Sequence, residues 1–332
     1  MERRAWLQGA MGLGAGWLVN GCEESKTGAT GRAASETATT KRGTAGQPRI
    51  VGMSQCNLGE PWRVQMNEDV AKAVAAHDDM RVVFKDAQND SLRQRAQVEE
   101  LVAQNIDLLI ISPKETAPLT KPVAEAFAAG IPVIVLDRRV AGDRFTTFIG
   151  ADNERIGREA GKHAAAILDG KGKVVELKGL MTSSPGQARH AGFRKGLDLE
   201  SHPGIEIVFE ADMQWLEANA RKEMESALAT HPVIDLVYAH NDPGAHGAYL
   251  AAKAAGRQDD IKLIGIDALP HEGVRYVEQG ILDATFAYPT GGAEAVATAR
   301  KILAGEPVPK EITLGTRRFT KADVAEGGVA IE

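Results

Sequence analysis

Short, almost wholly apolar runs recur along this chain, and each leads into polar residues. The clearest is Ile131–Leu136, which runs directly into Asp137 and Arg138. A continuous run of this length, rich in Val and Ile and flanked by helical patterning, predicts a strand buried on both faces of a parallel sheet. Six further runs share this design: Ile50–Ser54, Val82–Phe84, Leu108–Ile111, Val174–Leu177, Leu236–Ala239 and Leu263–Ile266.

Stretches with helical patterning separate these runs. Pro61 suits a first helical turn, and in the helix that follows it Val64, Asn67, Val70 and Val74 are expected on one face. Further helices are expected over Ser91–Val102, Thr116–Ala129, Asn153–Leu168, Gly186–Leu197, Leu216–Ala229, Ala245–Ala255, His271–Gln279 and Gly292–Leu303, and short strands over Phe145–Gly150, Ala284–Tyr288 and near Ile312. This alternation predicts an α/β fold of the doubly wound type.

Two local features refine the helix predictions. Ser91 with Gln94 forms a possible capping box, with Leu101 and Val102 on the buried side of the helix that follows. Trp215 stands beside charged Glu217 in a loop-like stretch, where core burial is less natural than at a strand.

The first 22 residues predict an export signal. Arg3 and Arg4 precede a moderately apolar, Gly-rich segment that reaches Cys22, and the ends of this segment resemble a twin-arginine signal and a lipobox. Cys22 is therefore the expected lipidation site and membrane anchor. A signal that is simply cleaved stays open, and so does an uncleaved span, although the apolar run is shorter than the roughly 20 residues that a span needs.

Residues 23–47 predict a flexible tether, because Ser, Thr, Gly, Ala and charged residues dominate them without apolar periodicity. Without residues 1–47, 285 of the 332 residues remain. A single core stops growing at roughly 250 to 300 residues, so two lobes are expected. The folded part keeps one cysteine, Cys56, which is expected to be a packed thiol.

Charge and strand ends bear on the class of partner. The net charge is −6, and no segment gathers Lys and Arg, which disfavours nucleic acid as a partner. Ligands of open α/β sheets sit at the carboxyl edge, which is where Asp137 and Arg138 are expected. A local salt bridge that caps the strand end is the alternative for this pair.

These residues also carry a resemblance to a known family. Val51–Gln55 followed by Trp62 and Arg63, then Leu136–Arg138, Tyr238–Asp242 and Gly265–Pro270, resemble the ribose-type (type I) periplasmic sugar-binding proteins, and among them the galactofuranose-binding branch most. The resemblance covers residues 49 to 319. It implies two Rossmann-like lobes joined by three hinge crossings, a monosaccharide held between them, and delivery to an ABC importer without catalytic residues, cofactor or metal.

The resemblance also implies lobe boundaries and a ligand site. One lobe is expected over residues 48–151 and 289–313 and the other over 152–288 and 314–332, with crossings near Ala151, Tyr288 and Ile312. The expected ligand-binding residues are Trp62, Arg63, Asp86, Asp137, Arg138, Arg189, Trp215, Asn241, Asp267 and Tyr288. Tyr288, Pro243 and Ala268 depart from residues common in the family, which leaves the identity of the sugar open.

The chemistry of these residue types supports the implied site independently. Carboxylates, amides and guanidinium groups suit the hydroxyls of a sugar as charge-assisted partners, and the two tryptophans could sandwich its ring. Without the family, Trp62 could equally pack a helix start, Asp267 could cap a helix and Arg189 could be a solvated helix residue.

Three other functions are alternatives to a solute carrier of an ABC importer. An enzyme is disfavoured, because Ser54–Gly59 has neither the glycine spacing of a dinucleotide site nor a phosphate-binding Lys, Gly52–Cys56 lacks the final Gly of a nucleophile elbow, and the histidines have no metal-site spacing. A sugar-responsive repressor would need an N-terminal helix-turn-helix where the signal stands. A ligand sensor for a membrane receptor or histidine kinase stays open beside the ABC permease.

We expect an extracytoplasmic, membrane-anchored monomer.

Overall fold

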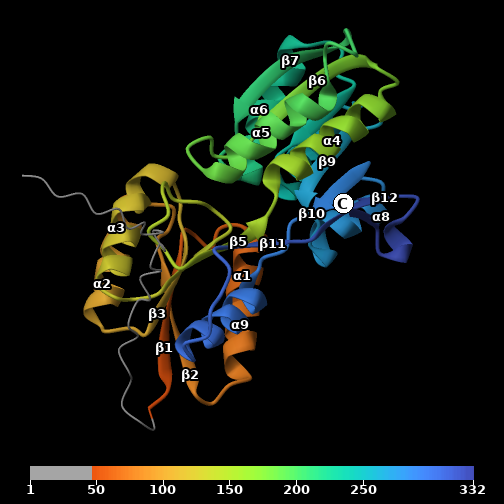
Figure 1. The fold of residues 1–332 in the computed structure, drawn as a ribbon. Coiled ribbons are helices and arrows are strands. Elements are labelled where there is room, and N and C mark those ends of the chain that lie inside the picture. The colour runs from red at the N-terminus through yellow and green to blue at the C-terminus, as the bar shows by residue number, and fades with distance from the viewer. Residues whose placement is uncertain (1–46) are drawn as a thin grey trace, which may run out of the picture. The chain divides into compact units, whose positions relative to one another are not determined.

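Two sheets organise the part of the chain that the computed structural model describes, residues 47–332 (Figure 1). The signal, Cys22 and nearly all of the tether lie outside these residues. The first sheet is wholly parallel, with strand order β11-β5-β4-β3-β1-β2. Its strands are β1 (Arg49–Gln55), β2 (Met80–Asp86), β3 (Leu108–Ser112), β4 (Val133–Leu136), β5 (Thr147–Ala151) and β11 (Glu311–Leu314).

The second sheet has the order β13-β12-β10-β9-β8-β6-β7, in which β12 runs in the opposite direction to the other strands. Its strands are β6 (Lys171–Lys178), β7 (Gly204–Asp212), β8 (Leu236–Ala239), β9 (Lys262–Asp267), β10 (Ala284–Ala287), β12 (Thr316–Thr320) and β13 (Val329–Ile331). The predicted α/β class with two doubly wound lobes is confirmed. The apolar pattern had not predicted β7, β12 and β13.

Alternate residues of each central strand face opposite layers of helices, which is why these strands are continuously apolar. In the first sheet Ile110 and Ile134 belong to the core beneath α1 (Pro61–Ala75) and α9 (Gly292–Leu303). Their neighbours Ile111 and Val135 belong to the core beneath α2 (Ser91–Ala103) and α3 (Thr116–Ala128). Figure 1 shows α1 beside α9 and α2 beside α3.

Helix α1 begins as predicted, with Pro61 in the first turn, but its buried face differs from the prediction. Trp62, Met66, Val70 and Val74 are buried, whereas Val64 is 40% exposed. Spacings of four residues keep the buried set on one stripe, and Val64 falls outside that stripe. The helix therefore presents Trp62 and Arg63 inward at its first turn.

The predicted capping box of α2 is wrong. The side chain of Asp90 caps this helix, accepting from the amides of Leu92 and Arg93. Gln94 is buried instead and donates to the carbonyl oxygen of Ser112 at 2.9 Å. Gln94 thus ties α2 to the ends of the strands.

The second lobe has the same layering. Helices α4 (Asn153–Ile167) and α5 (Ser184–Leu197) pack against each other, and α6 (Glu217–Thr230) packs against α7 (Asp242–Ala254). A π-helical turn (Pro270–Val274) and α8 (Arg275–Glu278) follow β9. Gly196 allows the close approach of α5, because a Cβ atom there would collide with the carbonyl oxygen of Arg158 on α4.

The chain passes between the two sheets three times. It does so after Ala151, at Tyr288–Gly291 before α9, and at Gly315 between β11 and β12. Strand β11 of the first sheet ends at Leu314. All three crossings lie close in sequence to strand ends, which brings the carboxyl edges of the two sheets to a shared site.

Candidate functional site

A cavity with about 270 Å³ of empty space lies where elements of both lobes meet. All the sequence-predicted ligand residues line it except Asp86, and Glu60 and Pro185 complete the lining.

The structure does not bring Asp86 to this cavity. Strand β2, which ends in Asp86, is the outermost strand of the first sheet, beyond β1. The Asp86 carboxylate accepts a hydrogen bond from the amide of Gln88 in its own loop, at 2.9 Å. The position of β2 at the sheet edge, and not the residue type, separates Asp86 from the other strand-end residues.

Asp137 organises the first-lobe side of the cavity. It occupies the centre of a tight γ-turn, with φ of 67° and a bond of 2.7 Å from the amide of Arg138 to the carbonyl of Leu136. Its Oδ2 accepts from Arg63 Nη1 at 2.6 Å and from Ser112 Oγ at 3.0 Å. Such strained backbone is characteristic of functional sites.

The charge of Asp137 is well supported. Burial opposes its ionisation, but the charges of Arg63 and Arg138 outweigh burial and hold the pKa of the Asp137 carboxyl below its usual range. The hydroxyl of Tyr288 donates to Oδ1 at 2.9 Å. A carboxylate accepts about four hydrogen bonds, so Asp137 keeps little acceptor capacity for a ligand.

Arg138 is held by a neighbour other than Asp137. Its Nη1 donates to the carbonyl oxygen of Lys114 at 2.9 Å, whereas its Nε lies 3.7 Å from Asp137 Oδ2. This Nε is buried without a hydrogen-bond partner among the described residues. The local salt bridge considered as an alternative is thus a loose contact, and Arg138 retains a donor for the cavity.

Arg189 enters the cavity from the second turn of α5. Its Nε donates to Asn153 Oδ1 at 2.8 Å, and its Nη1 donates to the carbonyl oxygen of His240. The guanidinium also lies 5.3 Å from the ring centre of Trp215 and 4.6 Å from that of Tyr288. Arg189 is therefore buried and fixed, and the alternative of a solvated helix residue is wrong.

Trp215 and Asn241 form the second-lobe wall. Trp215 follows β7 in a left-handed conformation with φ of 72°, and its indole Nε1 is buried without a hydrogen-bond partner in the described chain. Asn241 Nδ2 donates to the carbonyl of Trp215 at 3.0 Å, while its Oδ1 caps α7 by accepting from Gly244. Asn241 thus joins a structural cap to a place in the cavity.

Asp267 is the less satisfied of the two central carboxylates. It ends β9 with φ of 128° and is 8% exposed. Arg189 Nη1 lies 3.7 Å from its Oδ1, and its side chain accepts no hydrogen bond from residues 47–332. Burial raises the pKa of Asp267 well above its usual range, against the opposing charge of Arg189. Asp267 does not cap a helix; the amide of Ala268 binds Asp242 instead.

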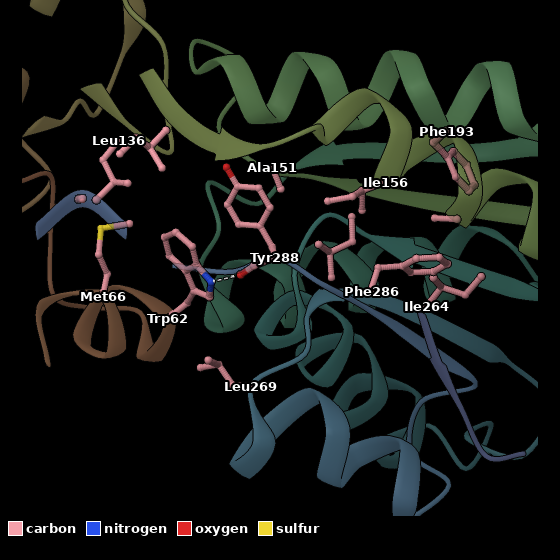
Figure 2. Close-up of a cluster of buried hydrophobic side chains, with 14 of the residues drawn as sticks. Trp62, Met66, Leu136, Ala151, Ile156, Phe193, Ile264, Leu269, Phe286 and Tyr288 are labelled. Atoms are coloured by element: carbon pink, nitrogen blue, oxygen red, sulfur yellow. Dashed lines mark hydrogen bonds between the residues drawn. The ribbon is translucent and has the colours of Figure 1, made fainter. Parts of the chain in front are cut away.

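Trp62 and Tyr288 form an aromatic pair beside the second crossing (Figure 2). The indole Nε1 of Trp62 donates to the carbonyl oxygen of Tyr288 at 2.7 Å, and the rings lie 5.2 Å apart. The Tyr288 hydroxyl accepts from Asn153 Nδ2 at 3.2 Å. Trp62 therefore holds the crossing as well as lining the cavity.

Sequence reasoning missed Glu60, a buried carboxylate that lines the cavity one residue before α1. It accepts from Asn57 Nδ2 at 3.0 Å, and its Oε2 lies 3.8 Å from Arg63 Nε. The signal was present, because Glu60 lies in the loop after β1, on the same edge as Trp62 and Arg63.

Neither a metal site nor a membrane span is found in residues 47–332. No group of three His, Cys, Asp or Glu side chains in residues 47–332 is arranged to hold a metal ion. No helix within that range is long and apolar enough to cross a membrane. The donor set of the cavity is instead one of guanidinium, carboxylate, amide and indole groups.

The family model of the periplasmic binding protein domain matches residues 51–307. The chain belongs to the periplasmic binding protein family. Its members are solute-binding proteins and not enzymes, in agreement with the prediction from the sequence.

Three relatives of this periplasmic binding protein illustrate the match. The ribose import binding protein RbsB of Bacillus subtilis is 32% identical over 265 residues, which cover 79% of this chain and 84% of the relative. The fructose-binding periplasmic domain of the hybrid two-component system BT1754 is 40% identical with a TM-score of 0.81, covering 84% of this chain and 93% of that one. A galactofuranose-binding protein is 27% identical with a TM-score of 0.78, over 84% and 97% of the two chains. The resemblance to sugar-binding members of the family is confirmed.

Proposed function

We propose that this protein captures one monosaccharide in the cavity between its lobes and presents it to a membrane partner. The observation that carries the proposal is the lining of that cavity, in which polar and aromatic groups from both lobes converge. Trp62, Arg63, Asp137 and Arg138 come from the first lobe, and Arg189, Trp215, Asn241 and Asp267 from the second. A ligand that touches both sets would hold the lobes together.

The balance of charges in the lining favours a neutral, hydroxyl-rich ligand. Three arginines face three acidic residues: Arg63, Arg138 and Arg189 against Glu60, Asp137 and Asp267. Sugar hydroxyls both donate and accept, so they can bind carboxylates and guanidinium groups at once. The indoles of Trp62 and Trp215 offer apolar faces for the C–H surface of the ring.

An ABC importer is the proposed partner, because a relative that is 32% identical over 79% of this chain is named a ribose import binding protein. A membrane sensor is the second candidate, favoured by the 40% identity to a domain of a hybrid two-component system. Either partner would read closure of the lobes. Reconstitution with the candidate permease or receptor encoded nearest to this protein separates the two.

We further propose that one lobe comprises residues 48–151 and 289–313 and the other residues 152–288 and 314–332. The mature protein is anchored outside the cytoplasm through Cys22 and the tether of residues 23–47. A single acyl chain binds membranes only marginally, whereas two or more hold stably. Replacing Cys22 with Ser should release soluble protein after signal cleavage. Recovery of this variant in the membrane pellet, with its signal removed, would contradict the anchor.

A thermal-shift screen of residues 48–332 tests the ligand proposal. The panel contains pentoses, hexoses in pyranose and furanose forms, and polyols, with a disaccharide and a sugar acid as controls. A monosaccharide at 100 times its Kd should stabilise the fold by about 2.7 kcal/mol, which shifts the melting temperature by several degrees. A shift produced only by the sugar acid or the disaccharide would contradict a neutral monosaccharide ligand.

A further inference from the structure

A fully buried carboxylate, Glu176 on β6, lies outside the lining of the cavity. Its Oε1 is 2.9 Å from His190 Nδ1 and 3.0 Å from His240 Nε2. Its Oε2 accepts from Arg194 Nε at 3.1 Å and Nη2 at 3.0 Å. Burial opposes ionisation, but the contacts with His190 and His240 lower the pKa of Glu176 to about 2, so its charge persists at neutral pH.

The bond to Glu176 defines the state of His240. An ionised carboxylate only accepts, so Nε2 of this imidazole carries the donated proton. Burial lowers the pKa of His240, which keeps the ring neutral. Its Nδ1 has no hydrogen-bond partner in residues 47–332, so the bond to Glu176 is the polar contact that orients the ring.

His240 in turn locates residues of the cavity. Its carbonyl oxygen accepts the Nη1–H bond of Arg189. The next residue, Asn241, lines the cavity and holds the carbonyl of Trp215 at 3.0 Å. A shift of His240 would therefore move the carbonyl oxygen that binds Arg189, and it would also displace Asn241 and, through it, Trp215.

Glu176 also holds the helix that carries Arg189. His190 is the next residue of α5, and Arg194 lies one turn further along it. Both side chains end on the Glu176 carboxylate, at 2.9 to 3.1 Å. One buried charge thus joins the end of β8 to α5, the two elements between which Arg189 is fixed.

We infer that Glu176 is a positioning residue for ligand recognition, acting through His240 and α5 to fix Arg189 in the cavity. Side chains behind a binding group orient it and so affect affinity without touching the ligand. The affinity readout rests on the proposed function, whereas the spectroscopic readout below does not.

The test compares Glu176→Gln with Glu210→Gln. Glu210 on β7 pairs with the same Arg194 and with Lys178 at 3.2 Å, but no contact joins it to His240. Loss of the outer partner of a metal-binding histidine costs about 10- to 100-fold in affinity, and we expect about tenfold weaker sugar binding for Glu176→Gln by the same reasoning. Glu210→Gln should bind as the unaltered protein does. Equal affinities of the two variants would overturn the inference.

Two further measurements keep the test decisive. Nitrogen NMR of the ligand-free protein should show slow exchange of the Arg189 Nε proton with solvent. Glu176→Gln should accelerate this exchange, and Glu210→Gln should not. Unchanged exchange in Glu176→Gln would overturn the inference even if no sugar in the panel binds. If Glu176→Gln does not fold, His240→Gln, whose amide can reach the position of Nε2, should keep the affinity and His240→Asn should lose it. Equal affinities of these two variants would also count against positioning through His240.

Discussion

Replacing Asp267 with Ala tests ligand recognition at the cavity carboxylate that has the most free capacity to accept hydrogen bonds. Asp267 is buried, its side chain accepts no hydrogen bond from residues 47–332, and Arg189 Nη1 is 3.7 Å away. A ligand hydroxyl would therefore supply its first direct donor. Asp137, by contrast, already accepts from Arg63, Ser112 and Tyr288.

The expected magnitude follows from these contacts. Removing one partner of a buried charged pair costs roughly 3 to 5 kcal/mol. The contact with Arg189 is longer than a hydrogen bond, and Arg189 keeps Asn153 and the His240 carbonyl as partners, so the lower end applies. About 3 kcal/mol corresponds to roughly 100-fold in affinity at about 1.4 kcal/mol per tenfold.

Titration calorimetry of Asp267→Ala and Glu225→Ala provides the assay. Glu225 is a suitable control because its side chain is 54% exposed and pairs with Arg221 of its own helix, at 3.1 Å. The control should bind as the unaltered protein does. Near-native affinity of a folded Asp267→Ala would remove this residue from the site.

The pH dependence of binding gives a second readout on Asp267. Burial raises the pKa of this carboxyl above its usual range in the free protein, and hydroxyl donors would favour its ionised form and lower the pKa in the complex. Binding then releases a proton, and affinity falls as the pH falls through the free-protein pKa. Calorimetry in two buffers of different ionisation enthalpy should show this release, and the Asp267→Ala variant should not.

Three further outcomes follow from the structure. Gly179→Ala should weaken sugar binding with the fold intact, because its Cβ would collide with the indole of Trp215, whereas Gly59→Ala, whose Cβ would meet only Asn57 Oδ1 at 3.6 Å, should bind normally in the same titration. The ionised Asp137 should stabilise the fold above its unfolded pKa of about 3.9, and this contribution should be lost as the pH falls through the lower pKa of the folded state. The free energy of unfolding in urea should therefore differ more between Asp137→Asn and the unaltered protein at pH 7 than at pH 3. Small-angle scattering should show a smaller radius of gyration with the cognate sugar, and an unchanged radius at saturation would count against a hinged clamp.

The sequence predicted the central strands and the groups at their ends because both depend on a local pattern. A strand buried on both faces is continuously apolar, so its polar terminus is visible in the sequence, as at Asp137, Arg138 and Asp267. Strands that are half exposed lack this pattern, and β7, with the burial of an edge strand, was missed for that reason. Asp86 was misplaced because strand order within the sheet is a tertiary property.

Side-chain partnerships could not be predicted from spacing either. Arg63 and Asp137 lie 74 residues apart, and Trp62 and the Tyr288 carbonyl lie 226 apart. Only the assembled lobes show that the Asp137 carboxylate accepts three hydrogen bonds from protein donors, whereas the Asp267 carboxylate accepts none from residues 47–332. The buried group around Glu176 depends on three separate elements and had no signal in the sequence.

We propose above all that the cavity between the lobes holds one neutral monosaccharide without changing it. Titrating the best monosaccharide of the thermal-shift panel into residues 48–332, and recovering the sugar afterwards for mass analysis, tests this directly. We predict one site per chain, a Kd of about 1 μM or tighter, equivalent to about −8.2 kcal/mol, and unaltered sugar. Binding of every neutral monosaccharide weaker than about 1 mM, or recovery of a converted sugar, would contradict the account.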